Sequence, residues 1–183
     1  MNNKYKSDED IIAWLESEYA QPFEGWDFSY LTQRRIHQES LPWRYDDVVL
    51  PCLSAAADML DIDTGGGEIL AKLLKQSGFS GKASAVEDFS PNIAIAAQHL
   101  AQFDVTVYDT SASPIKLEND QFDLVINRHG GSLSPEQTYS ALKPGGYFIT
   151  EQIGHQTNQE LRELFNAMQQ PATNWPHCAD DAR

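Results

Sequence analysis

The chain has 183 residues and a formal net charge of −14, with 13 Lys and Arg against 27 Asp and Glu. One domain accounts for this length, and the acidic balance argues against a partner held by phosphate neutralisation, such as duplex DNA. Hydrophobic residues make up 41% of the chain, so it can bury a core instead of remaining disordered.

The polar N-terminus has no signal-peptide core, and no apolar stretch approaches the ~18 residues of a membrane span. Cys52 and Cys178 are 126 positions apart and lack the paired spacing of zinc sites or disulfide scaffolds. His37, His99 and His177 have no companion ligands at metal spacing. We therefore expect a cytoplasmic protein without membrane or metal association.

Residues 1–56 are expected to form a helical, aromatic-rich extension that acts as a lid or lies on the substrate side. Apolar residues recur at helical spacing over 8–20, which predicts an amphipathic helix. The segment 22–45 is rich in aromatic residues among Gly and Pro, and it is expected to be mostly irregular. Its rings can pack into the core or line an acceptor pocket; the candidates for the pocket are Trp26, Tyr30, Trp43 and Tyr45.

From residue 57 to the end, short apolar runs alternate with helical segments, as in an α/β fold with a parallel sheet. The expected strands are 57–63, 82–87, 104–108, 122–127 and 147–153. The expected helices are 68–76, 90–101, 135–142 and 158–169, and residues 143–146 are expected to form a turn. Together, residues 57–183 are predicted to form one Rossmann-like core.

The run LDIDTGGGE lies at the first strand-to-helix junction. Its three glycines let the backbone approach a ligand closely, and the helix that follows directs unpaired N–H groups towards it. Glu87 ends the next strand, 20 residues beyond Gly67, at the offset where an acid commonly binds ribose hydroxyls. The pattern predicts a nucleoside ligand.

Two other nucleotide sites fit less well. A dinucleotide fingerprint would need glycine where Leu70 stands, which disfavours an NAD-dependent oxidoreductase without removing it as an alternative. A phosphate-binding P-loop would need Lys and Ser or Thr after the glycines, and neither is present.

Four segments between about residues 57 and 155 resemble the successive motifs of class I S-adenosylmethionine-dependent methyltransferases: LDIDTGGGE, AVEDFSPN, FDLVINRH and LKPGGYFITEQIG. The upstream segments GWDFSYL and LPWRY resemble the aromatic N-terminal extension of a bacterial branch of that family. The resemblance implies a doubly wound sheet of five parallel strands in the order 3-2-1-4-5, with helices on both faces. It also implies S-adenosylmethionine as the cofactor.

The same resemblance assigns parts of the cofactor to residues. Asp61 would lie near the methionine portion, Glu87 would bind the ribose, and Asp88 with Phe89 would flank the adenine. Asp109 and Thr110 are weaker candidates for the adenine amino group. The full set of implied cofactor-binding residues is Asp61, Asp63, Thr64, Gly65, Gly66, Gly67, Glu87, Asp88, Phe89, Asp109, Thr110, Asn127 and Arg128.

On the acceptor side, the resemblance places Asn127 and Arg128 near the methyl group, and it makes His129 the best-placed base if the acceptor must lose a proton. His129 can equally cap or bond backbone groups, and His155 is a second candidate. Glu151 and Gln152 lie near the pocket mouth or are solvated loop ends. We predict catalytic functions for His129 and Asn127.

Two features depart from the family pattern. Asp63 stands where the family usually has glycine; Asp tolerates a positive φ, and its carboxylate could either reduce affinity or attract a cationic cofactor. The chain also ends where an antiparallel hairpin should follow, which would leave the strand at 147–153 as an edge. We expect either a truncated form of a longer protein or a homodimer that covers this edge.

The function expected from these features is methyl transfer to a small-molecule acceptor. The alternative is a non-catalytic or degenerate methyltransferase-like binding protein. Asp63 and the missing hairpin favour this alternative.

Overall fold

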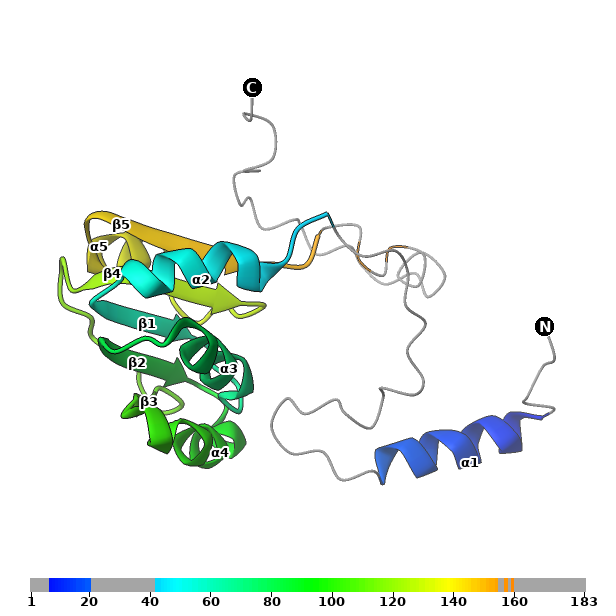
Figure 1. Ribbon diagram of the computed structural model, residues 1–183. Coiled ribbons are helices and arrows are strands. Elements are labelled where there is room, and N and C mark those ends of the chain that lie inside the picture. The colour runs from blue at the N-terminus through cyan, green and yellow to red at the C-terminus, as the bar shows by residue number, and fades with distance from the viewer. Residues whose placement is uncertain (1–6, 21–41, 155–156, 158, 160–183) are drawn as a thin grey trace.

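The computed structural model describes residues 7–20, 42–154, 157 and 159. Residues 42–154 contain a five-stranded parallel sheet in the order β3-β2-β1-β4-β5 (Figure 1). The strands are β1 (Asp58–Ile62), β2 (Lys82–Glu87), β3 (Thr106–Asp109), β4 (Phe122–Arg128) and β5 (Leu142–Glu151). The order and direction confirm the predicted Rossmann-like doubly wound sheet.

Helices cover both faces of this sheet (Figure 1). One face carries α2 (Tyr45–Ala55), α3 (Glu68–Ser77) and α4 (Ser90–Leu100), and the other carries α5 (Pro135–Ala141). Alternate residues of each strand point to opposite faces, so Met59 lies in the first hydrophobic cluster and Leu60 in the second. Two apolar layers therefore hold the sheet between its helices.

Helix α2 was not expected from the sequence, because Pro51 and the aromatic residues before it obscure its periodicity. Val49 and Leu53 on this helix are fully buried, and they share a cluster with Leu70 and Leu73 of α3. The predicted division of the chain at residue 56 remains a prediction, but α2 packs into the same core as the first strand.

Left-handed backbone positions explain two strand boundaries. β1 stops at Ile62 because Asp63 adopts φ 57°. Asp104, with φ 56°, ends the 3-10 helix η2 (Ala101–Phe103), so β3 begins at Thr106 instead of 104. Asp is among the few residues that accept this conformation.

The expected turn at 143–146 is instead an irregularity within β5. Phe122 and Leu124 of β4 face Leu142 and Tyr147 of β5, so the intervening residues of β5 bulge from the sheet, with Gly145 at φ 84°. β5 lies at the edge of the described sheet, and Tyr147 is 62% exposed. A homodimer across this edge remains a prediction.

Helix α1 (Asp8–Tyr19) confirms the helix expected at 8–20. Ser7 and Asp10 form a capping box at its start, and none of its residues is buried. Trp26, Tyr30, His37, His155, Cys178 and nearly all of the helix expected at 158–169 lie outside the described residues. Within the described ranges, no helix has both the length and the apolar character that crossing a bilayer requires.

Candidate functional site

The bend between β1 and α3 is shaped by left-handed backbone positions. Gly67 adopts φ 80° and serves as the N-cap of α3. A Cβ at this position would lie 3.0 Å from Cγ of Leu100 and 3.3 Å from Cα of Ala96, both on α4. Glycine is therefore needed both for the conformation and for the close approach of α4, and the N-terminus of α3 is held at the carboxyl edge of the sheet.

Glu87 closes β2 beside this bend. One oxygen, Oε2, accepts the Gly65 N–H at 2.6 Å, and Oε1 accepts the Phe89 N–H at 2.8 Å. Glu87 is 3% exposed, and burial raises its pKa above the ordinary value, against the lowering effect of the two N–H groups. Each carboxylate oxygen can accept a second hydrogen bond, so the side chain retains acceptor capacity.

Asp61, near the end of β1, is buried at the same edge. The hydroxyl of Thr64 donates to its Oδ2 at 2.7 Å. Burial raises the pKa of Asp61 to about 7, the hydrogen bond from Thr64 opposes the shift, and the charges of Asp63 and Glu87 add to it. Three carboxylates therefore share one edge, which makes it attractive to a cation.

Asp63 connects the bend to the loop between β4 and α5. Its Oδ2 accepts the Ser132 N–H at 3.0 Å, whereas its Oδ1 is buried without a hydrogen-bond partner in the described structure. A Cβ at Gly130 would lie only 2.0 Å from Oδ2, so the carboxylate fits because residue 130 is glycine.

Other buried polar atoms along the same edge also lack partners among the described residues. They are the hydroxyl of Thr110, which follows β3, and both amide atoms of Asn92, in the first turn of α4. The Thr110 N–H donates to the Glu87 carbonyl at 2.9 Å, which places Thr110 directly beside β2. A buried polar group without a partner costs about 1–3 kcal/mol, so these atoms fit a site that a polar ligand completes.

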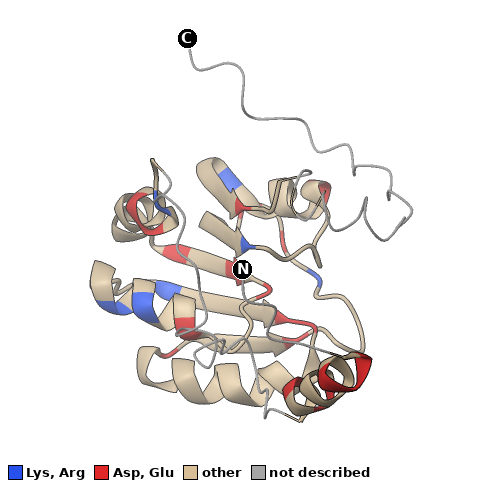
Figure 2. Ribbon diagram, turned by 90° about the vertical axis from the view of Figure 1, so that its right-hand side faces the viewer, with Lys and Arg blue, Asp and Glu red and all other residues tan. Residues whose placement is uncertain are grey.

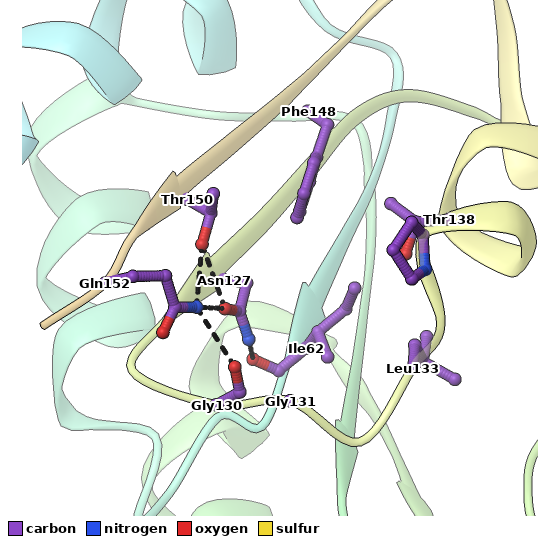
Figure 3. Close-up of a pocket in the computed structure, with 10 residues that line it drawn as sticks. Ile62, Asn127, Gly130, Gly131, Leu133, Thr138, Phe148, Thr150 and Gln152 are labelled. Atoms are coloured by element: carbon purple, nitrogen blue, oxygen red, sulfur yellow. Dashed lines mark hydrogen bonds between the residues drawn. The ribbon is translucent and has the colours of Figure 1, made fainter. Parts of the chain in front are cut away.

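Asn127 on β4 differs, because both the nitrogen and the oxygen of its side-chain amide have partners. Its Nδ2 donates to the Ile62 carbonyl at 3.0 Å, and its Oδ1 accepts from the Thr150 hydroxyl at 3.1 Å and from Gln152 Nε2 at 2.6 Å (Figure 3). Asn127 is 3% exposed. These bonds brace the carboxyl ends of β1, β4 and β5, and a catalytic function for Asn127 remains a prediction.

A small hollow, open to solvent, lies beside this network on the α5 side of the sheet (Figure 3). Its lining combines apolar side chains with the bonded amides and with the β4–α5 loop. The residues are Ile62, Asn127, Gly130, Gly131, Leu133, Pro135, Thr138, Phe148, Thr150 and Gln152. The hollow does not include the glycine bend or Glu87.

Arg128 and His129 converge on Glu151 of β5. Nε of Arg128 donates to Oε2 of Glu151, and His129 Nε2 lies 3.7 Å from the same oxygen. His129 adopts φ 65°, its N–H donates to the Glu151 carbonyl at 2.8 Å, and its side chain is 43% exposed. The sequence left Glu151 as either a residue near the pocket mouth or a solvated loop end; its place near the end of the strand expected at 147–153 was the available signal.

Tyr45, at the start of α2, contacts the end of β4 near these residues. Its hydroxyl donates to the Asn127 carbonyl at 3.5 Å. Burial raises its pKa well above the ordinary value, and the charges of Asp61 and Glu151 add to this shift. Tyr45 is thus a neutral hydroxyl near both Asp61 and Glu151. Trp43, which was predicted together with Tyr45 as a candidate pocket residue, is exposed.

The remaining predicted residues lie farther from the buried contacts. Asp88 and Phe89 are exposed after β2. Asp109 is also exposed, and its Oδ1 accepts both the N–H and the hydroxyl of Ser111, which lowers its pKa. In the described segments, no three His, Cys, Asp or Glu side chains gather as metal ligands would.

No protein-family model and no curated protein sequence matches the chain. Among solved structures, it is similar to a SAM-dependent methyltransferase from Aquifex aeolicus at 20% identity and a TM-score of 0.52, over 82% of this chain and 75% of that one. The chain has the methyltransferase fold. At this identity, the likeness establishes the fold alone.

Two further solved structures that resemble the chain are longer than it. The YcgJ protein from Bacillus subtilis matches at 18% identity and a TM-score of 0.47, over 58% of this chain and 49% of that one. A SAM-dependent methyltransferase from Geobacter sulfurreducens, solved with S-adenosylhomocysteine, matches at 19% identity and a TM-score of 0.47, over 66% and 51%. The chain spans about half the length of these two proteins.

Proposed function

We propose that the chain binds S-adenosylmethionine along the carboxyl ends of β1 and β2 and transfers its methyl group to a small-molecule acceptor. The observation that carries this proposal is the contact between the glycine bend and Glu87, in which the Gly65 N–H donates to the carboxylate across the two strands. This contact holds an acidic side chain beside a bend where the backbone can approach a nucleoside.

The residues of the edge fit the parts of such a cofactor. Glu87 retains lone pairs for two adjacent ribose hydroxyls. The unpartnered Thr110 hydroxyl suits a polar edge of the base, and the exposed Asp88 and Phe89 would flank it. The buried Asp61, beside the bend, would lie near the methionine portion of the molecule.

When bound, S-adenosylmethionine supplies an activated methyl group, so the protein chiefly has to align donor and acceptor. Arg128 and His129 lie at the end of β4, next to the proposed cofactor edge. The carboxylate of Glu151 lies close to both side chains, and the His129 ring is exposed enough to reach an acceptor. We propose His129 as the group that takes a proton from the acceptor, where one must leave.

The charge distribution favours a small acceptor over a nucleic acid. Figure 2 shows Lys and Arg scattered over several elements of the acidic molecule. Four of the described cations form ion pairs; they are Arg44, Lys72, Arg128 and Lys143. Such pairs leave little positive potential for binding phosphates.

Isothermal titration calorimetry of the whole chain tests the proposed cofactor. S-adenosylmethionine and S-adenosylhomocysteine should bind at one site per chain, and NAD should not bind. Mass spectrometry of any nucleoside that copurifies with the protein gives an independent test. Binding of NAD in preference to both S-adenosylmethionine and S-adenosylhomocysteine would overturn the proposal.

A non-catalytic binding protein is the second candidate, and the state of Glu87 favours it. Both carboxylate oxygens already accept backbone N–H groups, and the side chain is almost inaccessible. A folded chain that binds none of the three ligands would support this candidate. Cofactor binding followed by methyl transfer to a member of a metabolite panel would exclude it.

A further inference from the structure

Asp63 introduces a carboxylate at a position where the methyltransferase family that the sequence resembles usually has glycine. Its two oxygens have different surroundings. Oδ2 is fixed by the Ser132 N–H at 3.0 Å, whereas Oδ1 is buried and has no partner in the described structure. One oxygen therefore orients the carboxylate, and the other retains its acceptor capacity.

The surrounding backbone accommodates this particular side chain. A Cβ at Gly130 would lie 2.0 Å from Oδ2 and 2.3 Å from Cβ of Asp63. Because these distances are too short for real atoms, any other residue at 130 would displace the carboxylate. Asp63 and Gly130 thus form one feature, built from two loops that are distant in the sequence.

The arrangement opposes stability while no ligand is present. A left-handed conformation is less favourable for Asp than for glycine, and a buried acceptor without a partner destabilises the folded chain. Asp63 also adds a negative charge near the buried Asp61 and Glu87. Asn would tolerate the same backbone and could offer Ser132 the same acceptor without this charge. The charge is therefore the feature that needs an explanation, and a cation would neutralise it.

The position of Asp63 in the sheet indicates which part of a ligand it meets. β1 lies between β2 and β4, and Glu87 ends β2. Asp63 follows β1 and reaches towards the β4 side, where it contacts Ser132. A nucleoside with its ribose at Glu87 that extends across β1 brings its opposite end to Asp63. In S-adenosylmethionine and S-adenosylhomocysteine, that end is an amino acid with an ammonium group.

We propose that Oδ1 of Asp63 binds the α-ammonium group of the amino-acid portion of the cofactor, and that Asp63 thereby selects nucleosides with such a tail over those without one. This inference rests on the proposed function, because it assumes that the ribose binds at Glu87. Asp63 acts in binding and specificity and is not required for the transfer step itself.

Two ligands isolate this interaction by calorimetry. S-adenosylhomocysteine carries the ammonium group but no sulfonium, and 5′-methylthioadenosine keeps the adenosine and the thioether but lacks the amino acid. For Asp63→Asn, we expect binding of S-adenosylhomocysteine to weaken by about tenfold or more, since an ion-assisted hydrogen bond is lost. Binding of 5′-methylthioadenosine should change less than about twofold, because the interaction it lacks is the one removed.

Asp120→Asn is the matched control, because Asp120 is exposed and also has a positive φ, of 52°. It should leave both affinities unchanged. Asp63→Gly provides a second variant with full backbone freedom, and it should lose the same preference for S-adenosylhomocysteine. Circular dichroism establishes that each variant is folded.

An equal loss of affinity for both ligands, or no loss for either, would overturn the assignment of Asp63 while leaving the proposed function intact. Failure of the wild-type chain to bind either ligand would instead overturn the proposed function and, with it, this inference.

Discussion

The two halves of the sheet's carboxyl edge differ in how far their polar groups are satisfied. At the ends of β1 and β2, three carboxylates lie close together, and Asp63 Oδ1 has no partner in the described structure. At the ends of β4 and β5, Asn127 uses both atoms of its amide, and Arg128 is paired with Glu151. Both halves belong to the same sheet and lie within one hydrogen-bonded network of strands.

This difference distinguishes the candidate binding site, at the ends of β1 and β2, from a structural frame, at the ends of β4 and β5. The first half carries like charges and unpaired acceptors that weaken folding, which is the pattern expected where a ligand completes the structure. The second half is complete by itself, and it holds β1, β4 and β5 in register. Substitutions in the first half should change binding and pH dependence, and those in the second half should change stability.

The largest expected effect is on pH dependence, in Asp61→Asn. Folding raises the pKa of Asp61 to about 7, so between about pH 4 and pH 7 the folded chain holds a proton that the unfolded chain has released. The free energy of unfolding of the wild type should therefore fall as the pH rises through this window. The variant lacks this loss. Its free energy of unfolding, relative to that of the wild type, should therefore rise by on the order of 4 kcal/mol between pH 4 and pH 8. Urea unfolding across pH measures it, and parallel pH profiles for the two proteins would contradict it.

Asn127→Ala should lower the free energy of unfolding by about 2–3 kcal/mol, because the buried Ile62 carbonyl loses its donor and Thr150 and Gln152 lose an acceptor. Chemical denaturation measures the loss. Asn119→Ala, at an exposed position, is the matched control and should cost little. A stability loss for Asn127→Ala as small as that of the control would show that this network does not hold the strands.

Glu87→Ala should weaken binding of S-adenosylmethionine by about 1–3 kcal/mol, if its carboxylate holds both ribose hydroxyls. Titration calorimetry measures the change in the dissociation constant. Glu118→Ala removes an acidic side chain at an exposed position and serves as the control. An unchanged dissociation constant for Glu87→Ala would remove Glu87 from the site.

The smallest effect is expected for Arg128→Ala. The side chain of Arg128 is partly exposed, and ion pairs of this kind contribute about 0–1 kcal/mol. Thermal unfolding at low and high salt should show a loss within this range that shrinks as salt is added. A loss above about 2 kcal/mol would place Arg128 in the frame together with Asn127, and it would blur the distinction between the two halves.

Much of the fold could be predicted because strands and helices of this type carry their own periodic signals. Helices α3, α4 and α5 and strands β2 and β4 lie within a residue or two of their expected bounds. Helix α2 was not identified, since Pro51 lies in its interior and its stabilising contacts, with α3 and the sheet, are tertiary. The strand β5 begins five residues earlier than expected, because its pairing with β4 continues through the glycine bulge.

The candidate site also combines features that the sequence indicated with features that only the structure shows. The sequence placed Asp61, Asp63, Glu87 and the glycines at or near strand ends; the structure adds that Thr64 contacts Asp61 and that Gly65 contacts Glu87. The contact of Asp63 with Ser132 and the position of Glu151 beside His129 could not be read from the sequence. Both join segments separated by more than 20 residues, and no local pattern records such a pairing.

The sequence by itself determined the alternation of strands and helices, the glycine bend and the acid at the end of the next strand, since each depends on residues close together in the chain. Only the tertiary structure decided which polar atoms are satisfied. That outcome depends on which loops the sheet order β3-β2-β1-β4-β5 brings side by side, and on burial that removes water as an alternative partner. Asp63 shows both levels: its identity is local, but the partner of one oxygen and the isolation of the other arise from the fold.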